Sequence, residues 1–160
     1  MVRWAVHRRN QAPRVAKIIE RSRTTEEKAL KEIGILKKMD CPCIVKLYQC
    51  FVTARFIYLL FAPFGGREVH SPLLEVQGCT LRNMRAVFKQ IFIGFTHLHA
   101  KKIFHCNLVP EHILIAEAGE EVSVKIIGFG NAVNMESKKK EGHNEEPAQL
   151  SKEQKINVIW

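Results

Sequence analysis

The stretch that decides the fold runs from residue 105 to residue 130. It begins with His105-Cys106-Asn107-Leu108-Val109-Pro110-Glu111-His112 and ends with Gly128-Phe129-Gly130. The polar residues and the proline before residue 112 predict a loop. Apolar residues at 113–116 and 122–127 predict two strands, which the Glu-Ala-Gly-Glu turn separates.

Upstream, strands are expected to alternate with helices. Thr24 or Thr25 is expected to cap a helix whose apolar residues recur every three or four positions and which ends near Asp40. A second, longer helix with a broad apolar stripe is expected over 80–100. Four further strands are predicted, in two pairs joined by turns, at 5–7, 14–19, 44–48 and 56–61.

Four motifs, taken in this order, resemble those of the protein kinase family. Val15-Ala16-Lys17 is similar to the family's V-A-I-K strand, and Glu32 follows like the glutamate that pairs with that lysine. Residues 105–112 resemble the catalytic loop H-R-D-L-K-P-E-N, and residues 128–130 resemble D-F-G. The resemblance covers residues 5–135, and its style is that of the calmodulin-kinase group, particularly the death-associated and titin/obscurin-like kinases.

The resemblance implies an α+β kinase-like fold. A small β-rich N-lobe would occupy about 1–63, and the beginning of the helical C-lobe about 64–135. No activation segment, A-P-E or further helices follow Gly130, so we expect a truncated domain. Residues 136–160 are polar apart from a few apolar residues near residue 160 and are expected to form a disordered tail. The apolar stripe of the 80–100 helix would then be exposed, which implies a partner, aggregation, or a chain that is a fragment of something longer.

Five positions at which the family places its chemistry carry other residues. By resemblance, Asn107 replaces the catalytic aspartate and Gly128 the Mg²⁺-binding aspartate, while His112 replaces the second metal ligand. Val109 and Cys106 replace the lysine and arginine of the loop. An amide takes up no proton at neutral pH, glycine offers no side-chain oxygen, and imidazole suits Mg²⁺ poorly. Catalysis by the usual mechanism is therefore not expected.

The nucleotide site is also incomplete by the family's pattern. No G-x-G-x-x-G is present, and Pro63 has no N–H at the position where the family contacts adenine. The remaining candidate nucleotide contacts are Lys17, Glu32, Val15 and Leu114. We expect no cofactor and no metal, with ATP bound without Mg²⁺ as the alternative. Lys17 and Glu32 also admit a purely structural interpretation, as an ion pair that docks the helix.

By the same resemblance, four apolar or aromatic positions match the stacked side chains that link the two kinase lobes. They are Leu36, Leu47, His105 and Phe129. Such a stack is itself part of a core, so its structural and functional interpretations nearly coincide.

Composition narrows the function classes. The 160 residues are 46% hydrophobic and 26% charged, enough apolar material for a core, which argues against wholesale disorder; their formal charge is +9. No apolar run reaches the roughly 18–20 residues of a membrane span. The odd number of cysteines and the lack of a visible secretory signal predict a reduced, cytoplasmic chain. Cys41-Pro42-Cys43 has one residue between its thiols, unlike the spacing of a zinc knuckle or redox pair.

Three function hypotheses follow from these patterns. The first is a catalytically inactive pseudokinase that acts as a protein-binding scaffold, with a cytoskeletal or sarcomeric setting as one option. The second is an active or weakly active serine/threonine kinase, or an ATP-binding protein, that uses Lys17 and Glu32. The third is a binder of nucleic acid or an acidic surface, because the first 39 residues hold eleven Lys or Arg and four Glu. The residues that would carry the third are Arg8, Arg9, Arg21 and Arg23. The alternative interpretation of the basic cluster is a solvated helix face that binds no partner.

Overall fold

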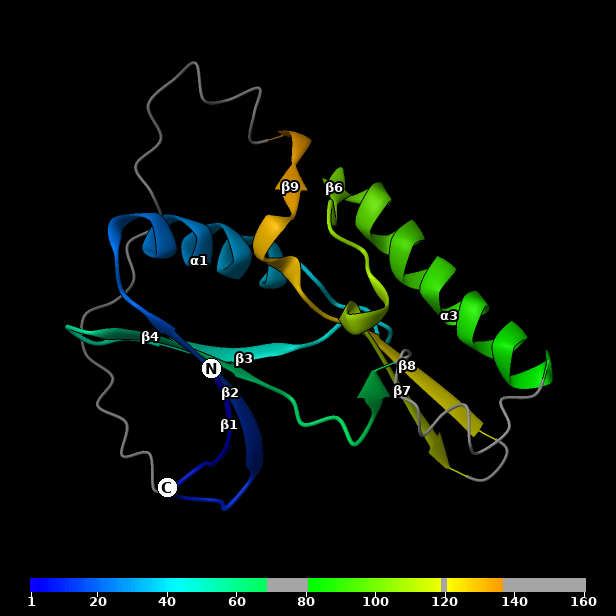
Figure 1. The fold of residues 1–160 in the computed structure, drawn as a ribbon, viewed down its shortest axis with the longest axis horizontal. Helices are drawn as coiled ribbons and strands as arrows, with labels where there is room; N and C mark the ends of the chain where they lie inside the picture. Colours follow the sequence, from blue (N-terminus) through cyan, green and yellow to red (C-terminus); the bar gives the residue numbers. More distant parts are fainter. Residues whose placement is uncertain (69–80, 119–120, 137–160) are drawn as a thin grey trace.

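The chain folds as two connected parts, a sheet covered by one helix and a hairpin covered by a longer helix (Figure 1). The computed structural model describes residues 1–68, 81–118 and 121–136. Its elements, in order, are β1 (Val2–Val6), β2 (Pro13–Glu20), α1 (Arg23–Leu36), β3 (Leu47–Val52), β4 (Phe56–Phe61), β5 (Arg67–Glu68), α3 (Leu81–Ala100), β6 (Ile103–Phe104), η1 (Pro110–His112), β7 (Ile113–Ala118), β8 (Glu121–Ile126), η2 (Phe129–Asn131) and β9 (Val133–Asn134). The expected α+β fold is confirmed.

The first part is an antiparallel sheet with strand order β1-β2-β4-β3. Its register places Val2 opposite Lys17 and Val15 opposite Phe61. Alternate residues of a strand point to opposite faces. One face packs under α1 and buries Ile57, Leu59 and Phe61. The other face holds a smaller apolar cluster of Ala5, Ala16, Ile18 and Leu60.

Ser22, rather than Thr24 or Thr25, caps α1. The Ser22 hydroxyl accepts the backbone N–H of Thr25 at 3.2 Å, and the Thr25 hydroxyl accepts the backbone N–H of Ser22 at 2.8 Å. This reciprocal capping box satisfies donors that the first helical turn leaves free. The helix ends at Leu36, before the predicted end near Asp40, because the N–H groups of Lys38 and Met39 turn back to carbonyls three residues earlier.

The strand predicted at 44–48 is displaced, since β3 starts only at Leu47. Ile44 instead forms a parallel bridge with Ile126 on β8. The N–H of Val45 donates to the Ile126 carbonyl at 3.0 Å, and the N–H of Ile126 donates to the Cys43 carbonyl at 2.8 Å. Ile44 is fully buried. The apolar run that suggested a sheet strand therefore joins the two parts of the chain.

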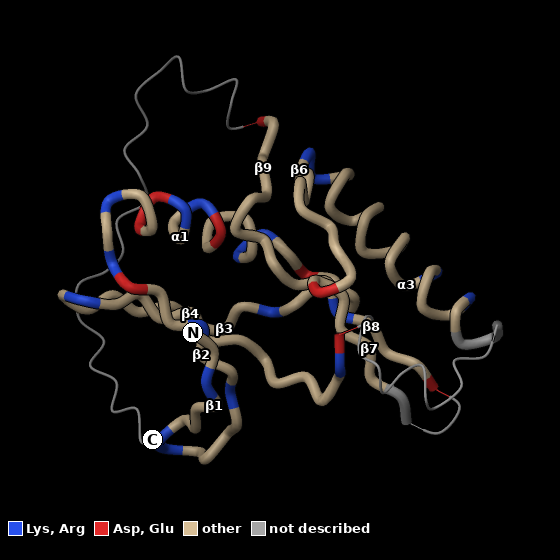
Figure 2. The backbone as a smooth tube through the Cα atoms, viewed as in Figure 1, with Lys and Arg blue, Asp and Glu red and all other residues tan. Residues whose placement is uncertain are grey.

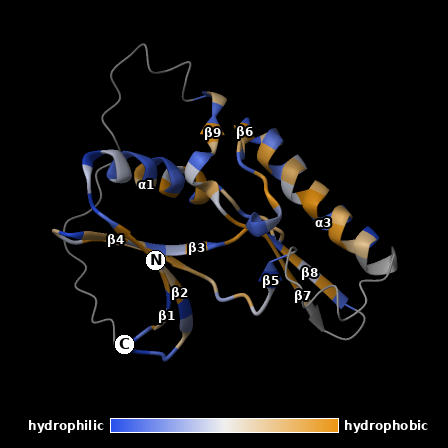
Figure 3. Ribbon diagram, viewed as in Figure 1, coloured by the Kyte–Doolittle hydropathy of each residue, from blue (hydrophilic) through white to orange (hydrophobic). Residues whose placement is uncertain are grey.

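The second part is the β7–β8 hairpin with α3 across it. The Gln90 amide on α3 donates to the Val122 carbonyl at 2.6 Å and accepts the Val124 N–H at 3.0 Å. Gly94 permits close packing, because a Cβ there would lie 2.6 Å from the Ile126 side chain. Figure 3 shows hydrophobic residues along α3 and on the hairpin. The cluster between them consists of Val87, Ile91, Ile113, Ile115 and Val124.

Two short strand pairs were not predicted. Arg67 on β5 pairs with Ile115 on β7, and Ile103 on β6 pairs with Asn134 on β9. Residue 80, where the second helix is expected to begin, lies outside the described residues, as does the expected tail of 136–160 apart from Glu136. Within the described ranges, no helix has the length and apolar character needed to cross a membrane.

Candidate functional site

Lys17 and Glu32 form an ion pair between the sheet and α1. The Lys17 Nζ lies 2.8 Å from Oε1 and 2.7 Å from Oε2 of Glu32. The Glu32 side chain is almost fully buried, whereas the side chain of Lys17 is 33% exposed. A Cβ on Gly130 would lie 3.6 Å from Oε2 of Glu32, so α1 also stands close to η2. The structure thus brings together two of the four candidate nucleotide contacts.

His105 is a buried, neutral histidine at the start of the loop. Its Nε2–H donates to the Ile127 carbonyl at 2.8 Å, since a carbonyl can only accept. Burial lowers the pKa of His105, against a smaller opposing effect of the Ile127 hydrogen bond. The Nδ1 atom is buried without a hydrogen-bond partner among the described residues. The ring instead packs edge-on against Phe129, with 4.8 Å between ring centroids.

The predicted stack between the lobes is present as part of the main core. Leu36 and Phe129 are buried in one cluster, and Leu47 packs against it. His105 completes the stack through its contact with Phe129. The four residues come from α1, β3, the loop and η2, so they tie the sheet to the segment that contains the altered catalytic positions.

His112 occupies the space beside Gly128. Its Nδ1–H donates to the backbone carbonyl of Asn107 at 2.8 Å, which fixes the ring over the loop. A Cβ on Gly128 would lie 2.5 Å from two ring carbons of His112 and 2.6 Å from Nδ1. The φ angle of Gly128 is +84°, a left-handed conformation that disfavours other residues. The imidazole therefore fills the place where an aspartate side chain at 128 would begin.

The other three altered positions of the loop carry no acid. Asn107 is half-buried, and Val109 lies before η1, where its carbonyl accepts the His112 N–H at 2.9 Å. Cys106 is exposed in a left-handed conformation, and its thiol contacts the Phe104 carbonyl. In the part of the chain that the structure describes, no group of three or more His, Cys, Asp or Glu side chains is placed to hold a metal.

Val15 and Leu114 lie on two different sheets. Val15 is on β2 and packs against the main core, whereas Leu114 is on β7 opposite Lys125. Both are half-buried. Between the two parts, the N–H of Ala62 donates to the Lys46 carbonyl at 3.0 Å, and Pro63 follows with no N–H. The connection therefore offers few donors to an adenine ring.

Similarity to known proteins identifies the family that has this fold. A model of the protein kinase domain matches residues 1–151. This chain belongs to the protein kinase family. The kinase domain is 33% identical to calcium-dependent protein kinase 5 of Plasmodium falciparum (isolate 3D7) over 129 residues, which are 80% of this chain and 23% of that relative. It is 30% identical to striated muscle preferentially expressed protein kinase of Danio rerio over 118 residues, which are 74% of this chain and 4% of that relative.

In the sequence of this kinase domain, two losses look separate. His112 stands where the family has a metal ligand, and Gly128 where it has a metal-binding carboxylate. The geometry couples them, because the ring at 112 lies where a side chain at 128 would start. The sequence does contain a signal of this coupling, because an aromatic ring at His112 occurs together with a glycine at position 128.

Proposed function

We propose that this kinase domain is catalytically inactive, a pseudokinase that acts by binding other proteins. The observation that carries the proposal is the His112 ring packed against Gly128. A carboxylate at 128 is missing, and the imidazole also takes up the space in which one would have to be built. The inference concerns the residues of this chain, which spans less than a quarter of the relatives named above.

The chemical argument rests on charge. Phosphoryl transfer needs a base to orient the incoming hydroxyl and metal ions to neutralise the phosphates. Asn107 supplies an amide in place of the base, and Gly128 and His112 supply no oxygen ligand. Loss of one transition-state stabiliser typically costs about 10²–10³ in rate. Losses within one site are not additive, but several together remove efficient turnover.

Binding of ATP without Mg²⁺ is the second candidate function. The intact pair of Lys17 and Glu32 favours it, because one third of the lysine side chain faces solvent and a phosphate can approach the ammonium group. Against it stands Pro63, which has no N–H to offer an adenine ring.

A basic binding surface is supported least. Figure 2 shows Lys and Arg on α1 and on the β1–β2 pair, with acidic residues interspersed on α1. Arg21 binds Glu26 at 2.8 Å, an interaction that raises the pKa of the arginine, and Arg23 lies 3.7 Å from Glu27. Of the four arginines named for this function, Arg8 and Arg9 lie at the exposed β1–β2 turn and have no acidic partner among the described residues.

The binding role draws on exposed apolar residues. Large ones lie on α3 and near the loop, namely Phe88, Phe92, Ile93, Phe104 and Leu108. Contiguous exposed apolar surface usually marks an interaction site. The proposed setting is the cytoplasm, and the muscle kinase among the relatives makes a sarcomeric or cytoskeletal attachment the first one to examine.

The test is phosphate transfer by the full chain with ATP and Mg²⁺ or Mn²⁺, to itself and to casein, with Lys17→Ala as the control. We expect no difference between the two proteins. Turnover that disappears in Lys17→Ala would overturn the inactive assignment. Thermal unfolding with ATP, with and without Mg²⁺, separates the first two functions, because a ligand that binds the native state raises Tm. A metal-independent rise supports ATP binding, and no rise supports the scaffold.

A further inference from the structure

Two cysteine thiols lie in one tight turn at the junction of the two parts of the chain. The turn spans residues 41–44 and is closed by the Ile44 N–H, which donates to the Cys41 carbonyl at 3.1 Å. Pro42 lies at the second position of the turn, where proline is favoured. The cysteines that the structure describes are all free thiols, and Cys41 and Cys43 are the two that share this turn.

The turn keeps the two cysteines within reach of each other. Across two trans peptides their α-carbons are at most about 7.6 Å apart, and a turn brings them closer. Disulfides usually join α-carbons that are about 4.4–6.8 Å apart. Burial raises the pKa of the Cys43 thiol, and the Cys41 thiol raises it further through its charge and a hydrogen bond, against a smaller effect of Lys125. One intervening residue therefore suffices here to bring the thiols together.

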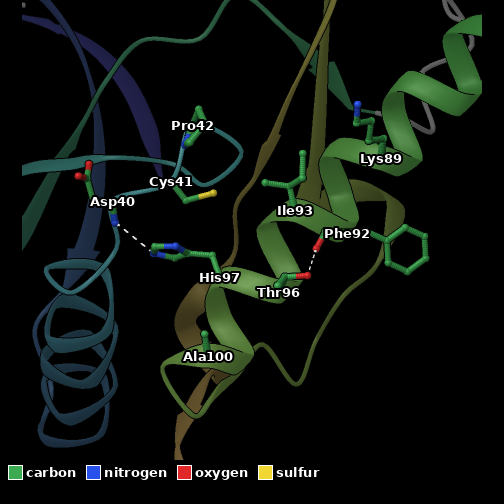
Figure 4. Close-up of a pocket in the computed structure, with 9 residues that line it drawn as sticks. All are labelled: Asp40, Cys41, Pro42, Lys89, Phe92, Ile93, Thr96, His97 and Ala100. Carbon is green, nitrogen blue, oxygen red and sulfur yellow. Dashed lines mark hydrogen bonds between the residues drawn. The ribbon is translucent and has the colours of Figure 1, made fainter.

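The two thiols differ in their access to solvent. Cys41 is half-buried and lines an open, mostly apolar groove between the turn and α3. Figure 4 shows its sulfur pointing from the turn toward α3. Cys43 is only 4% exposed, and its Cβ lies 3.6 Å from the position that a Cβ on Gly94 would take. A small molecule in the groove can thus reach the sulfur of Cys41, whereas Cys43 lies behind it against the helix.

We propose that Cys41 and Cys43 form a thiol–disulfide exchange site, in which Cys41 attacks a small disulfide such as oxidised glutathione and Cys43 resolves the mixed disulfide. The site lies beside the Ile44–Ile126 bridge that joins the two parts of the chain. Neither cysteine belongs to the loop at 105–112, so the inference is independent of whether the kinase domain is inactive.

The exchange takes place in two steps. The Cys41 thiolate attacks one sulfur of oxidised glutathione, the S–S bond of the glutathione dimer breaks, and one glutathione leaves as a thiolate. Cys43 then loses its proton and attacks Sγ of Cys41, so that the mixed disulfide breaks and the second glutathione leaves. Each departing thiolate takes up a proton. Two cysteine thiols are thereby oxidised to one disulfide, and one glutathione disulfide is reduced to two thiols.

Access and burial together assign the two roles. The thiolate is the attacking species, and a buried thiol with a raised pKa is a poor first nucleophile. Cys41, which lines the groove, therefore reacts first. Once Cys41 carries glutathione, the neighbouring Cys43 thiol is held next to it at a high effective concentration. Closure of the disulfide is then faster than attack by a second glutathione from solution.

The test uses the full chain, first reduced and then exposed to oxidised glutathione, with the remaining thiols alkylated before mass spectrometry. Tryptic cleavage after Lys38 and Lys46 releases a peptide that contains Cys41 and Cys43 and no other cysteine. We expect this peptide to have lost two hydrogens and to carry neither glutathione nor an alkyl group. Cys106, an exposed thiol on a different tryptic peptide, is the control for the reagent and should retain its glutathione.

Two matched variants test the order of the steps. Cys43→Ala should accumulate glutathione on Cys41, whereas in Cys41→Ala the remaining Cys43 should react several-fold more slowly. In concentrated urea the difference should disappear, because the fold causes it. Brief labelling of the unsubstituted chain with iodoacetamide tests the same order without any variant, and it should modify Cys41 several-fold faster than Cys43.

Three results would overturn the proposal. The first is glutathione that remains on Cys41 of the unsubstituted chain, because Cys43 would then not resolve it. The second is a disulfide from Cys41 or Cys43 to a third cysteine. The third is equal labelling of Cys41 and Cys43 in the native, unsubstituted chain, which would remove the distinction between the attacking and the resolving thiol.

Discussion

The imidazole of His112 lies against the α-carbon of Gly128, where the first atom of any side chain at 128 would have to sit 2.5 Å from the ring. A hydrogen bond to the Asn107 carbonyl holds that ring in place. Two altered positions, 112 and 128, are thus one packing arrangement, which the backbone at 107 supports. A side chain restored at 128 alone would collide with the ring at 112.

Gly128→Ala is therefore expected to destabilise the fold by about 2 kcal/mol or more, through left-handed strain and overpacking. In a His112→Ala background the overpacking disappears, and the same change should cost only about 1 kcal/mol. Urea unfolding of the four proteins measures the coupling between the two sites.

Gly34→Ala is the control for that cycle. Gly34 is an exposed residue in α1 with open space around its α-carbon, so alanine should stabilise the helix by up to about 1 kcal/mol. An equal cost of Gly128→Ala in both backgrounds would mean that His112 is not the obstacle.

Restoration of the phosphoryl-transfer site requires changes at the base position and at both metal-ligand positions. Asn107→Asp alone should leave the thermal response to ATP and Mg²⁺ unchanged, because the metal ligands are still missing. The combination of Asn107→Asp, His112→Asn and Gly128→Asp should create a Mg²⁺-dependent rise in Tm. At ATP tenfold above its Kd the native state gains about 1.4 kcal/mol. A Mg²⁺-dependent response already present in Asn107→Asp would contradict the loss of the metal ligands.

Removal of either charge of the Lys17–Glu32 pair should lower the free energy of unfolding, but by different amounts. Lys17→Met leaves a carboxylate buried without its cation, and we expect a loss of about 1–3 kcal/mol. Glu32→Gln leaves a lysine that can still reach solvent, so its loss should be smaller. Chemical denaturation checks the order. Glu27→Gln, in the exposed pair with Arg23, should change stability by less than about 0.5 kcal/mol.

His105 should make the fold sensitive to mild acid. Its pKa in the folded chain lies below the ordinary value of 6.5, so the unfolded chain binds the proton more readily. Stability contributed by the neutral ring is complete above about pH 6.5 and decreases as the pH falls below that value. The urea midpoint should therefore fall between pH 7 and pH 5.

The part due to His105 is isolated by comparison with His105→Phe. The variant keeps His112 and the other histidines, so the difference between the two pH profiles belongs to residue 105. Parallel profiles would show that the ring takes up protons equally well in both states.

Most elements could be predicted because they depend on local pattern. The apolar spacing of Ala29, Ile33 and Leu36 predicts the buried face of α1, and it is buried. The hairpin strand over 56–61 and the helix to Ala100 follow from equally simple periodicities. The cap of α1 was misplaced, because Ser22, Thr24 and Thr25 all have capping side chains and only the register of the helix distinguishes them.

Long-range packing could not be predicted. The run from Ile44 to Tyr48 has the pattern of a strand, but its first residues connect to β8 instead. The local sequence does not predict this connection. The position of the His112 ring depends on a hydrogen bond five residues back and on a glycine sixteen residues ahead. Such relations arise when distant segments come together, which single-residue preferences do not encode.

The bridge between Ile44 and Ile126 fixes where the two halves of the chain can pivot. Backbone hydrogen bonds on both sides of a fully buried isoleucine resist separation, so a rocking motion would turn about residues 43–45. Such rotation widens or narrows the side that holds Lys17 while hardly moving Pro42 against α3. A ligand bound beside residues 43–45 would be displaced little by this rotation. A ligand bound near Lys17 would be displaced most.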